Sequence, residues 1–457
     1  MGKFYLLVVF ILSAVLIQAQ DHSEFVQGPF STPQEVTDAC LGCHENVGDE
    51  VIHSNHWLWL DEKFETNDNQ ELQMGKKVFI NNFCIAVPSN YARCTSCHVG
   101  YGWDSNDFDF NNKSNIDCLI CHDQTGTYKK IPTGAGKPVD GVDLLAVAQS
   151  VDMPRVENCG ICHFDGGGGT GVKHGDLDET LYNASKELDV HMGGLDFDCI
   201  ECHKTVEHKI SGASHGSMAA GTNHIYCADC HTEAPHEKAK LNEHSKSIAC
   251  ETCHIPTFAR EEPTKTWWDW SKAGEDKEAP KDEFGKETYN KMKGEFVWEK
   301  NVIPTYRWYN GKADYYKMGD TLDVSQPVKL NSLNGDITEA NAKIAPFKVM
   351  RGKQIYDNVN DYLIVPHLFG KEGYWKTYDW NKASEIGMKE VELDYSGSFG
   401  FIETEMYWPI NHMVAPKENA LKCMDCHGKK GRMNWEELGY SGDPMKVGGR
   451  YKNELSP

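Results

Sequence analysis

The chain has 457 residues and a formal net charge of −22 at pH 7. A surface this acidic repels phosphate backbones, which excludes nucleic acid as a partner. The same charge suits a basic partner protein or simple solubility, and an anionic substrate would need a locally positive pocket.

The first predicted element is an export signal over residues 1–20. Lys3 provides a basic start, the stretch from Phe4 to Ile17 is apolar, and Ala19 is a small residue suited to cleavage. The apolar run is short for a membrane span, although an uncleaved anchor stays open as an alternative. No later segment is apolar enough to cross a bilayer. We therefore expect a soluble mature protein in a bacterial periplasm.

Eight CxxCH motifs follow the signal and dominate the chain. Their cysteine pairs are Cys40/Cys43, Cys94/Cys97, Cys118/Cys121, Cys159/Cys162, Cys199/Cys202, Cys227/Cys230, Cys250/Cys253 and Cys423/Cys426. In this motif two thiols bind the vinyl groups of a haem, and the adjacent histidine is the proximal iron ligand. A lone CxxC is typical of a zinc site or a redox pair, but here a histidine follows every pair. The sequence predicts eight covalent haem c groups, with proximal ligands His44, His98, His122, His163, His203, His231, His254 and His427.

The spacing of the motifs predicts the architecture. Six motifs lie between Cys94 and His254, so the stretches between them are too short to bury protein cores of their own. Packed haems must form the core, and we expect a mainly α fold with much irregular structure. Helices are expected around 34–60, 143–151, 234–249 and 416–427, while strand signals are weak. Residues 21–260 would form the haem-binding region, 261–414 an aromatic-rich haem-free cover, and 415–457 a C-terminal segment with the eighth haem.

One cysteine does not belong to any CxxCH motif. The chain has 17 cysteines and the motifs use 16 of them, which leaves Cys84. No intramolecular disulfide is then possible, although the expected compartment is oxidising. Cys84 is a free thiol, an intermolecular pair or a modified sulfur.

The histidines supply candidate distal ligands. Of 20 histidines, eight are proximal and 12 are spare. A pure electron-transfer protein would use eight distal ligands, whereas a catalytic one leaves at least one iron with an exchangeable or absent ligand; the count alone leaves both open. His22 is set aside because it lies near the cleavage site. His53 and His56 are alternatives on one helix face, and His56, beside Trp57, is preferred.

Several long stretches resemble one family. They include CTSCHVGYGW at 94–103, IDCLICHDQTGTYKK at 116–130, GGGGTGVKHGDLD at 166–178 and MYWPINHMVAPKENALKCMDCHG at 406–428. With these stretches the chain resembles the octahaem c-type cytochromes called octahaem tetrathionate reductases. The resemblance runs over nearly the whole mature chain.

The resemblance implies a special haem at the second motif. Its proximal ligand would be His98, its distal ligand the amine of Lys173, and Cys84 would lie beside the iron. These three would be the catalytic residues. Thr170 stands where the family protein has an Asp, which removes a candidate charge from the pocket. The other distal ligands implied are His56, His174, His191, His208, His236, His244 and His412.

The function that follows is reduction. Electrons from a redox partner protein or a quinol-oxidising donor would pass along bis-histidine haems to the Lys173 haem. There they would reduce tetrathionate to thiosulfate, or a nitrogen oxide such as nitrite, or hydroxylamine. The alternatives are an electron conduit without a substrate and a hydroxylamine-oxidising cytochrome, although no tyrosine stands in a motif that marks the latter class.

Overall fold

The computed structural model describes residues 21–61, 63–65, 71–83, 85–212 and 224–450. The expected export signal, Cys84 and His215 therefore lie outside the described residues. Within the described ranges, no helix is both long and apolar enough to cross a membrane.

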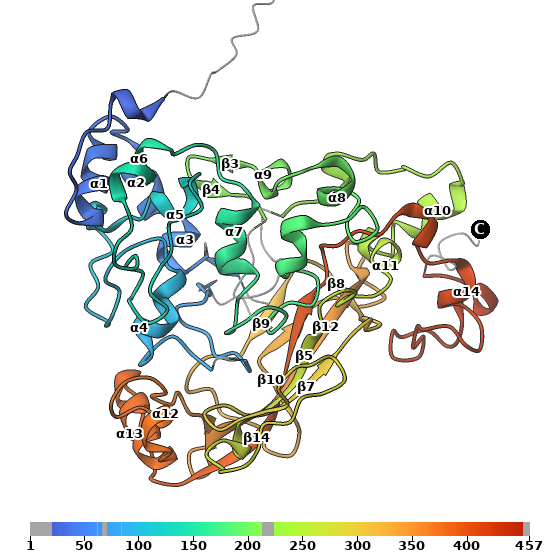
Figure 1. Cartoon of the computed structure of the whole chain (residues 1–457). Helices are drawn as coiled ribbons and strands as arrows, with labels where there is room; N and C mark the ends of the chain where they lie inside the picture. The colour runs from blue at the N-terminus through green and yellow to red at the C-terminus, as the bar shows by residue number, and fades with distance from the viewer. Residues whose placement is uncertain (1–20, 62, 66–70, 84, 213–223, 451–457) are drawn as a thin grey trace, which may run out of the picture.

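Short helices joined by irregular loops make up the first half of the chain (Figure 1). They are α1 (Pro33–Leu41), α2 (Val47–Ile52), α3 (Asn55–Leu58), α4 (Tyr91–Cys94), α5 (Leu119–His122), α6 (Leu144–Gln149), α7 (Val156–His163), α8 (Met192–Leu195), α9 (Cys199–Cys202), α10 (Ala239–His244) and α11 (Cys250–His254). The small hairpins β1–β2 (Phe64–Glu65, Glu71–Leu72) and β3–β4 (Thr205–Val206, Lys209–Ile210) lie among them. The expected helices near 34–60, 143–151 and 234–249 are present, but each is shorter or broken.

Every CxxCH motif lies on or at the end of a helical turn. The second motif runs through α4 into the 3-10 turn η2 (Thr95–Cys97), and the sixth begins the 3-10 turn η5 (Cys227–Asp229). The eighth lies on α14 (Cys423–Cys426). Residues three apart in a helical turn share a face, so both thiols of a motif can reach one haem.

The cover is built on a sheet, which the weak strand signals did not reveal. The sheet has eight strands, in the order β10-β14-β12-β5-β7-β6, and β8 and β13 also pair with β12. Their bounds are β5 (Thr264–Asp269), β6 (Tyr289–Asn290), β7 (Gly294–Glu299), β8 (Thr305–Tyr309), β10 (Val328–Lys329), β12 (Lys343–Asp357), β13 (Tyr362–Leu363) and β14 (Phe399–Pro409). A separate pair, β9 (Ala313–Tyr315) and β11 (Asn331–Leu333), is antiparallel. The helices α12 (Tyr374–Thr377), α13 (Trp380–Glu390) and α15 (Pro444–Val447) complete the fold.

The two longest strands form the centre of this sheet. β12 and β14 run antiparallel, with Phe347 opposite Pro409 and Asp357 opposite Phe399. β12 is buried along most of its length, because both faces of the strand are covered. Its sequence mixes charged and apolar residues without the regular alternation that marks a half-exposed strand.

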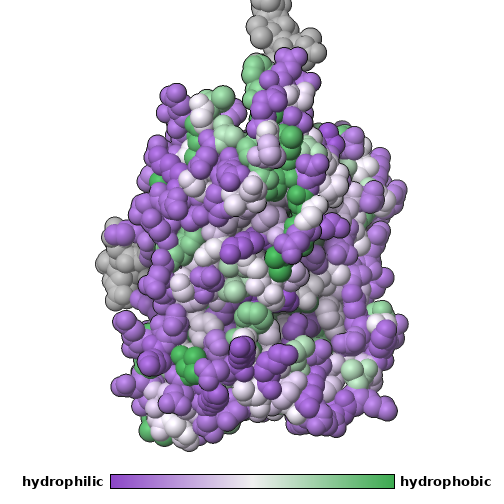
Figure 2. Space-filling view, turned by 60° about the vertical axis from the view of Figure 1, so that its left-hand side comes forward, coloured by the Kyte–Doolittle hydropathy of each residue, from purple (hydrophilic) through white to green (hydrophobic). Residues whose placement is uncertain are grey.

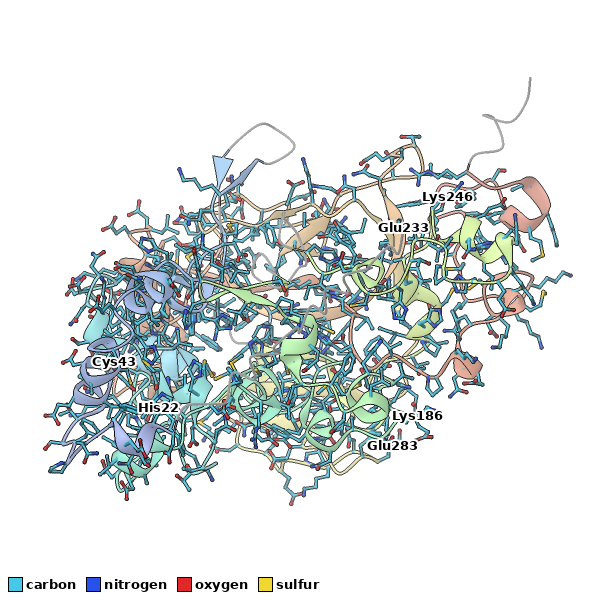
Figure 3. The ribbon with its side chains drawn as sticks, turned by 90° about the horizontal axis from the view of Figure 1, so that it is seen from above. His22, Cys43, Lys186, Glu233, Lys246 and Glu283 are labelled. Carbon is cyan, nitrogen blue, oxygen red and sulfur yellow. The ribbon has the colours of Figure 1, made fainter. Side chains whose placement is uncertain are left out.

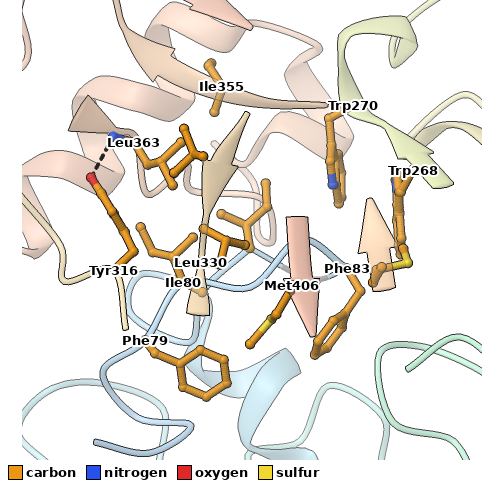
Figure 4. Close-up of a cluster of buried hydrophobic side chains, with 14 of the residues drawn as sticks. Phe79, Ile80, Phe83, Trp268, Trp270, Tyr316, Leu330, Ile355, Leu363 and Met406 are labelled. Atoms are coloured by element: carbon orange, nitrogen blue, oxygen red, sulfur yellow. Dashed lines mark hydrogen bonds between the residues drawn. The ribbon is translucent and has the colours of Figure 1, made fainter. Parts of the chain in front are cut away.

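The largest hydrophobic cluster joins the cover to the haem-binding region. Phe79, Ile80 and Phe83 pack against cover residues that include Trp268 and Met406 (Figure 4). In the same cluster the Tyr316 hydroxyl accepts a hydrogen bond of 2.9 Å from the backbone N–H of Leu363. The boundaries 21–260, 261–414 and 415–457 stay predictions, but the core does not divide at residue 260.

The outside of the molecule is polar, as the net charge requires. Figure 2 shows a face on which hydrophilic side chains predominate and apolar ones form small groups. Figure 3, seen from above, places His22 and Cys43 near one end of the molecule, and Glu233 and Lys246 toward the other.

Candidate haem array and active site

One continuous cavity of about 3560 Å³ runs through the haem-binding region. At least one cysteine from seven of the eight motifs lines its wall, and the first motif is the exception. The wall is mostly made of motif residues and short loops, with β5, β12 and β14 contributing from the cover. A cavity lined by the thiols of successive CxxCH motifs is the space in which the haems would lie.

The spacing of paired imidazoles fits iron between them. Two imidazoles bound to one metal through nitrogens at about 2.0 Å place their ring centres about 6 Å apart. Six pairs in the structure have this separation, between 6.0 and 6.4 Å: His22–His44, His56–His163, His191–His231, His203–His412, His236–His254 and His244–His427. Each pair contains one CxxCH histidine and one spare histidine. The side chains present therefore fit six bis-histidine irons.

A seventh pair is His122 and His208. Both side chains line the cavity, and burial, together with the nearby charge of His208, lowers the pKa of His122. The Nδ1 of His208 lies 2.7 Å from the Glu50 carboxylate, and the Nδ1 of His122 lies 2.9 Å from the Asp152 carbonyl. In each ring, Nδ1 is therefore fixed by its own partner, which leaves Nε2 directed to the cavity.

The same arrangement recurs in other pairs. A ligand histidine is normally oriented by a hydrogen bond from its second ring nitrogen. The Nδ1 atoms of five further paired histidines have such partners: His203 with the Ser211 carbonyl, His236 with Asn242, His244 with the Lys240 carbonyl, His412 with Asp176, and His427 with Asp443.

The carboxylate of Asp176 changes the pKa of His412. Burial opposes its protonation, but the hydrogen bond from its Nδ1 to Asp176 and the charge of that carboxylate raise its pKa above the usual value. His56 and His163 have no comparable carboxylate, and burial lowers the pKa of both, that of His163 to about 3. Both rings are therefore neutral at ordinary pH, the state in which an imidazole binds metal.

The pairing of rings differs from the sequence analysis at His22 and His174. His22 was set aside, yet its ring is stacked 6.4 Å from His44 at 29°. His174 was expected to be a distal ligand, but none of the described proximal histidines faces it. Its ring instead meets Trp408 edge-on at 5.2 Å, and burial followed by the neighbouring Lys173 lowers its pKa well below the usual value. No pattern in the sequence distinguished the two.

The structure also differs from the prediction at His98. Its ring is fully buried among Trp57, Trp59 and Trp103, with centroid distances of 5.0, 5.6 and 4.8 Å. The Nε2 lies 2.6 Å from the Trp57 carbonyl oxygen, while Nδ1 has no hydrogen-bond partner among the described residues. The proximal rings held through Nδ1 present Nε2 to the cavity, so His98 is turned the opposite way. The aromatic cage and the carbonyl hold it there.

Lys173 lies in the cavity wall together with Cys94 and Cys97. Its Nζ is 5.0 Å from the centroid of Trp408, and its side chain passes over Gly166, where an added Cβ would stand 3.1 Å from Lys173 Cδ. Gly167, Gly168 and Gly169 all have positive φ angles, which glycine adopts without strain. The glycine run therefore returns the chain from α7 to the wall of the cavity, where Lys173 approaches Trp408.

Contacts between cysteines order the motifs in space. Side chains of different motifs touch in four places: Cys40 with Cys118, Cys97 with Cys162, Cys159 with Cys199, and Cys227 with Cys250. Electrostatic contacts add Cys121 with Cys159, Cys202 with Cys230, and Cys253 with Cys423. Because each thiol marks the edge of a haem, the motifs follow the order one, three, four, five, six, seven, eight. The second motif is a branch that contacts the fourth.

A crystal structure of an octaheme cytochrome c from Shewanella oneidensis matches this architecture. It is 50% identical in sequence, superposes with a TM-score of 0.89, and the match covers 96% of this chain and 99% of that one. The chain belongs to the octahaem cytochromes c. The expected fold class and the eight covalent haem c groups are thereby confirmed.

Two further comparisons match parts of the chain. A family model described as bacterial cytochrome c matches residues 265–430, which span the cover and the eighth motif. An uncharacterized protein of Archaeoglobus fulgidus is 26% identical over 239 residues, which covers 41% of this chain and 80% of that protein.

Proposed function

We propose that this octahaem cytochrome c is an exported, periplasmic reductase whose active site is the haem of Cys94 and Cys97, with Lys173 as an exchangeable iron ligand. The observation that carries the proposal is an asymmetry among the motifs. Seven proximal histidines have a spare imidazole opposite them. In the described part of the chain, no second imidazole is ring-paired with His98, whereas the amine of Lys173 lines the same cavity as Cys94 and Cys97.

The other amines nearby are held by different partners. Lys130 forms an ion pair of 2.9 Å with the buried Asp117 and donates to the His98 carbonyl. Lys76 places its Nζ 3.9 Å from the centroid of Trp59. Lys173 comes after the glycine run, and its Nζ lies 5.0 Å from the centroid of Trp408. The expectation that His98 is the opposite ligand requires its Nε2 to leave the Trp57 carbonyl.

A lysine ligand suits a site that must open. An amine binds a metal only when deprotonated, and burial favours that state. Once protonated, it leaves and exposes the metal. Bound haem supplies one-electron transfer and an iron at which a small molecule can bind after the amine has left. The bis-histidine sites keep both ligands and suit electron transfer alone.

The charges around this site favour an anionic substrate. The chain as a whole is strongly negative, yet Lys76, Arg93, Lys130, Lys173 and Lys293 all line the cavity. Tetrathionate fits this environment as a dianion, and two electrons cleave its central S–S bond to give two thiosulfate ions without consuming a proton. Nitrite is a smaller anion, and hydroxylamine a neutral molecule, that could also bind a metal opened by the amine. The electrons would come from a redox partner protein or a quinol-oxidising donor.

Cys84 is the second proposed participant. Its thiolate would attack one sulfur of tetrathionate, forming a mixed disulfide with one thiosulfate unit and releasing the other. Two electrons would then return the thiolate and release the second thiosulfate. Cys84 lies outside the described residues. Its neighbour Phe83 packs 5.4 Å from Trp408, the ring that Lys173 approaches.

The test is Lys173→Met, with Lys186→Met as the matched control. Lys186 also lines the cavity, but its side chain packs on Gly194 of α8. We expect Lys173→Met to change the electron paramagnetic resonance signal of one haem and to alter turnover of tetrathionate, nitrite or hydroxylamine by roughly tenfold or more. The control should match the parent protein. Unchanged spectra and rates in Lys173→Met would leave an electron conduit as the function.

A further inference from the structure

A buried lysine of the cover reaches the segment that carries Lys173. Lys348 lies on β12 and is 1% exposed. Its Nζ donates to the carbonyl oxygens of Lys173 at 2.9 Å and Val172 at 3.1 Å, and to the hydroxyl of Thr264 at 2.6 Å. Three N–H donors thus meet three acceptors, which is the condition for burying an ammonium group.

Thr264, on β5, makes the second contact with this segment. Its hydroxyl lies 2.7 Å from the Gly171 carbonyl and 3.1 Å from the His174 carbonyl. The backbone N–H of Lys265 also donates to Gly171 at 3.0 Å. Carbonyls of residues 171 to 174 are therefore all held by two neighbouring strands of the cover.

The segment needs this support because its own backbone is soft. The glycine run before it has left-handed backbone angles, and Gly171 has a φ of +69°. A Cβ at Gly171 would stand 2.4 Å from the Pro263 carbonyl oxygen, so the chain passes β5 closely there. Glycine-rich backbone loses its freedom only where other elements fix it.

We infer that Lys348 is a positioning residue that, together with Thr264, fixes the backbone of Lys173 so that its amine meets the haem of Cys94 and Cys97. This inference rests on the proposed function, since it takes Lys173 as the ligand. Under this inference the haem-free cover not only shields the haems but also positions an iron ligand at the active site. Small displacements of a ligand-bearing backbone are costly because the metal requires its ligand at a defined place.

The far end of the segment is held separately. Asp176 accepts hydrogen bonds from the backbone N–H groups of Asn411 at 2.8 Å and His412 at 3.0 Å. The imidazole pair His203–His412 therefore keeps its geometry when the contacts of Lys348 are removed. Loss of Lys348 should change one haem and leave the bis-histidine haems as they are.

The experiment compares Lys348→Met and Thr264→Val with Lys265→Met in the haem-loaded protein. Lys265 is a buried lysine on the same sheet, but its Nζ lies 3.3 to 4.9 Å from the ring centroids of Phe296, Trp268 and Trp298. The readouts are the rate of cyanide binding and the resonance signal of the lysine-ligated haem. In both test variants we expect cyanide to bind that haem about tenfold faster, because the amine is held less firmly. Thr264→Val, which is nearly isosteric, serves if Lys348→Met folds poorly.

The outcomes separate the positioning role from the proposed function. Faster cyanide binding in both test variants, with parent behaviour in Lys265→Met, supports the positioning role. Parent behaviour in Lys348→Met and Thr264→Val, while Lys173→Met changes the signal, overturns the inference and leaves the proposed function standing. Equal acceleration in Lys265→Met would assign the effect to general loosening of the sheet and also overturn it. A silent Lys173→Met overturns the proposed function itself.

Discussion

His22→Ala tests the distal ligand of the first haem. The imidazole pair His22–His44 has the spacing of a bis-histidine iron, and removing one ring leaves that iron with a single strong ligand. We expect one iron in eight, about 12% of the haem, to change from low to high spin. The fold should tolerate the change, because the 3-10 turn η1 (His22–Glu24) contains no buried residue.

The assay is spin quantitation by electron paramagnetic resonance, with optical spectra as a second measure. His53→Ala and His174→Phe are the matched controls, since neither ring faces a proximal histidine in the described structure. His53 instead directs Nδ1 to the Asp49 carbonyl at 2.7 Å, and His174 packs on Trp408. A high-spin iron in His174→Phe together with a fully low-spin His22→Ala would refute the pairing by ring distance and restore the choice made from sequence.

Four further predictions follow from the haems and the charges around them. A pyridine haemochrome assay should find eight haems per chain, and the protein made without haem should not fold, because the haems form its core; fewer than seven haems, or a cooperatively folded apo-protein, would count against this. Asp443→Asn should raise the potential of the eighth haem, because a carboxylate 2.6 Å from Nδ1 of His427 makes that ligand more electron-rich; spectroelectrochemistry showing an unchanged or lower potential would contradict it. Cys84→Ser should lower tetrathionate turnover far more than nitrite or hydroxylamine turnover, and equal losses on all three would reduce the thiol to shaping the pocket. Burial raises the pKa of Asp178 to about 6, whereas an unfolded chain has its carboxyl near 4, so the folded state holds this proton more tightly. Its contribution to the free energy of unfolding therefore falls as pH rises from about 4 to 6, by up to about 1.4 kcal/mol per pH unit. Asp178→Asn should lose that slope in thermal unfolding, and pH profiles parallel to those of the parent protein would contradict the assignment.

Local chemistry determined what could be read from the sequence alone. A CxxCH motif carries both attachment thiols and one iron ligand within five residues, so it needs no knowledge of the fold. Eight motifs therefore predicted eight haems, a haem-filled core and one surplus cysteine. Dense motif spacing likewise predicted much irregular structure, since little chain is left between successive haems.

The cover shows where sequence patterns failed. Of the two central strands, β12 and β14, β12 is buried along most of its length and lacks the alternation of polar and apolar residues that would reveal a strand. Their pairing depends on contacts between residues far apart in the chain. The role inferred for Lys348 could not be read from sequence either, because its partners Thr264 and Lys173 lie on other elements.

Only the tertiary structure decided which imidazole faces which. His203 belongs to the fifth motif, yet the ring opposite it is His412, near the far end of the cover. His56 faces His163 in the same way. His22 faces His44, although its position near the expected cleavage site had argued against a role as an iron ligand. A distal ligand needs only to reach the iron through space, and any segment of the chain can bring it there. Proximal ligands are therefore a property of the sequence, whereas distal ligands are a property of the folded chain.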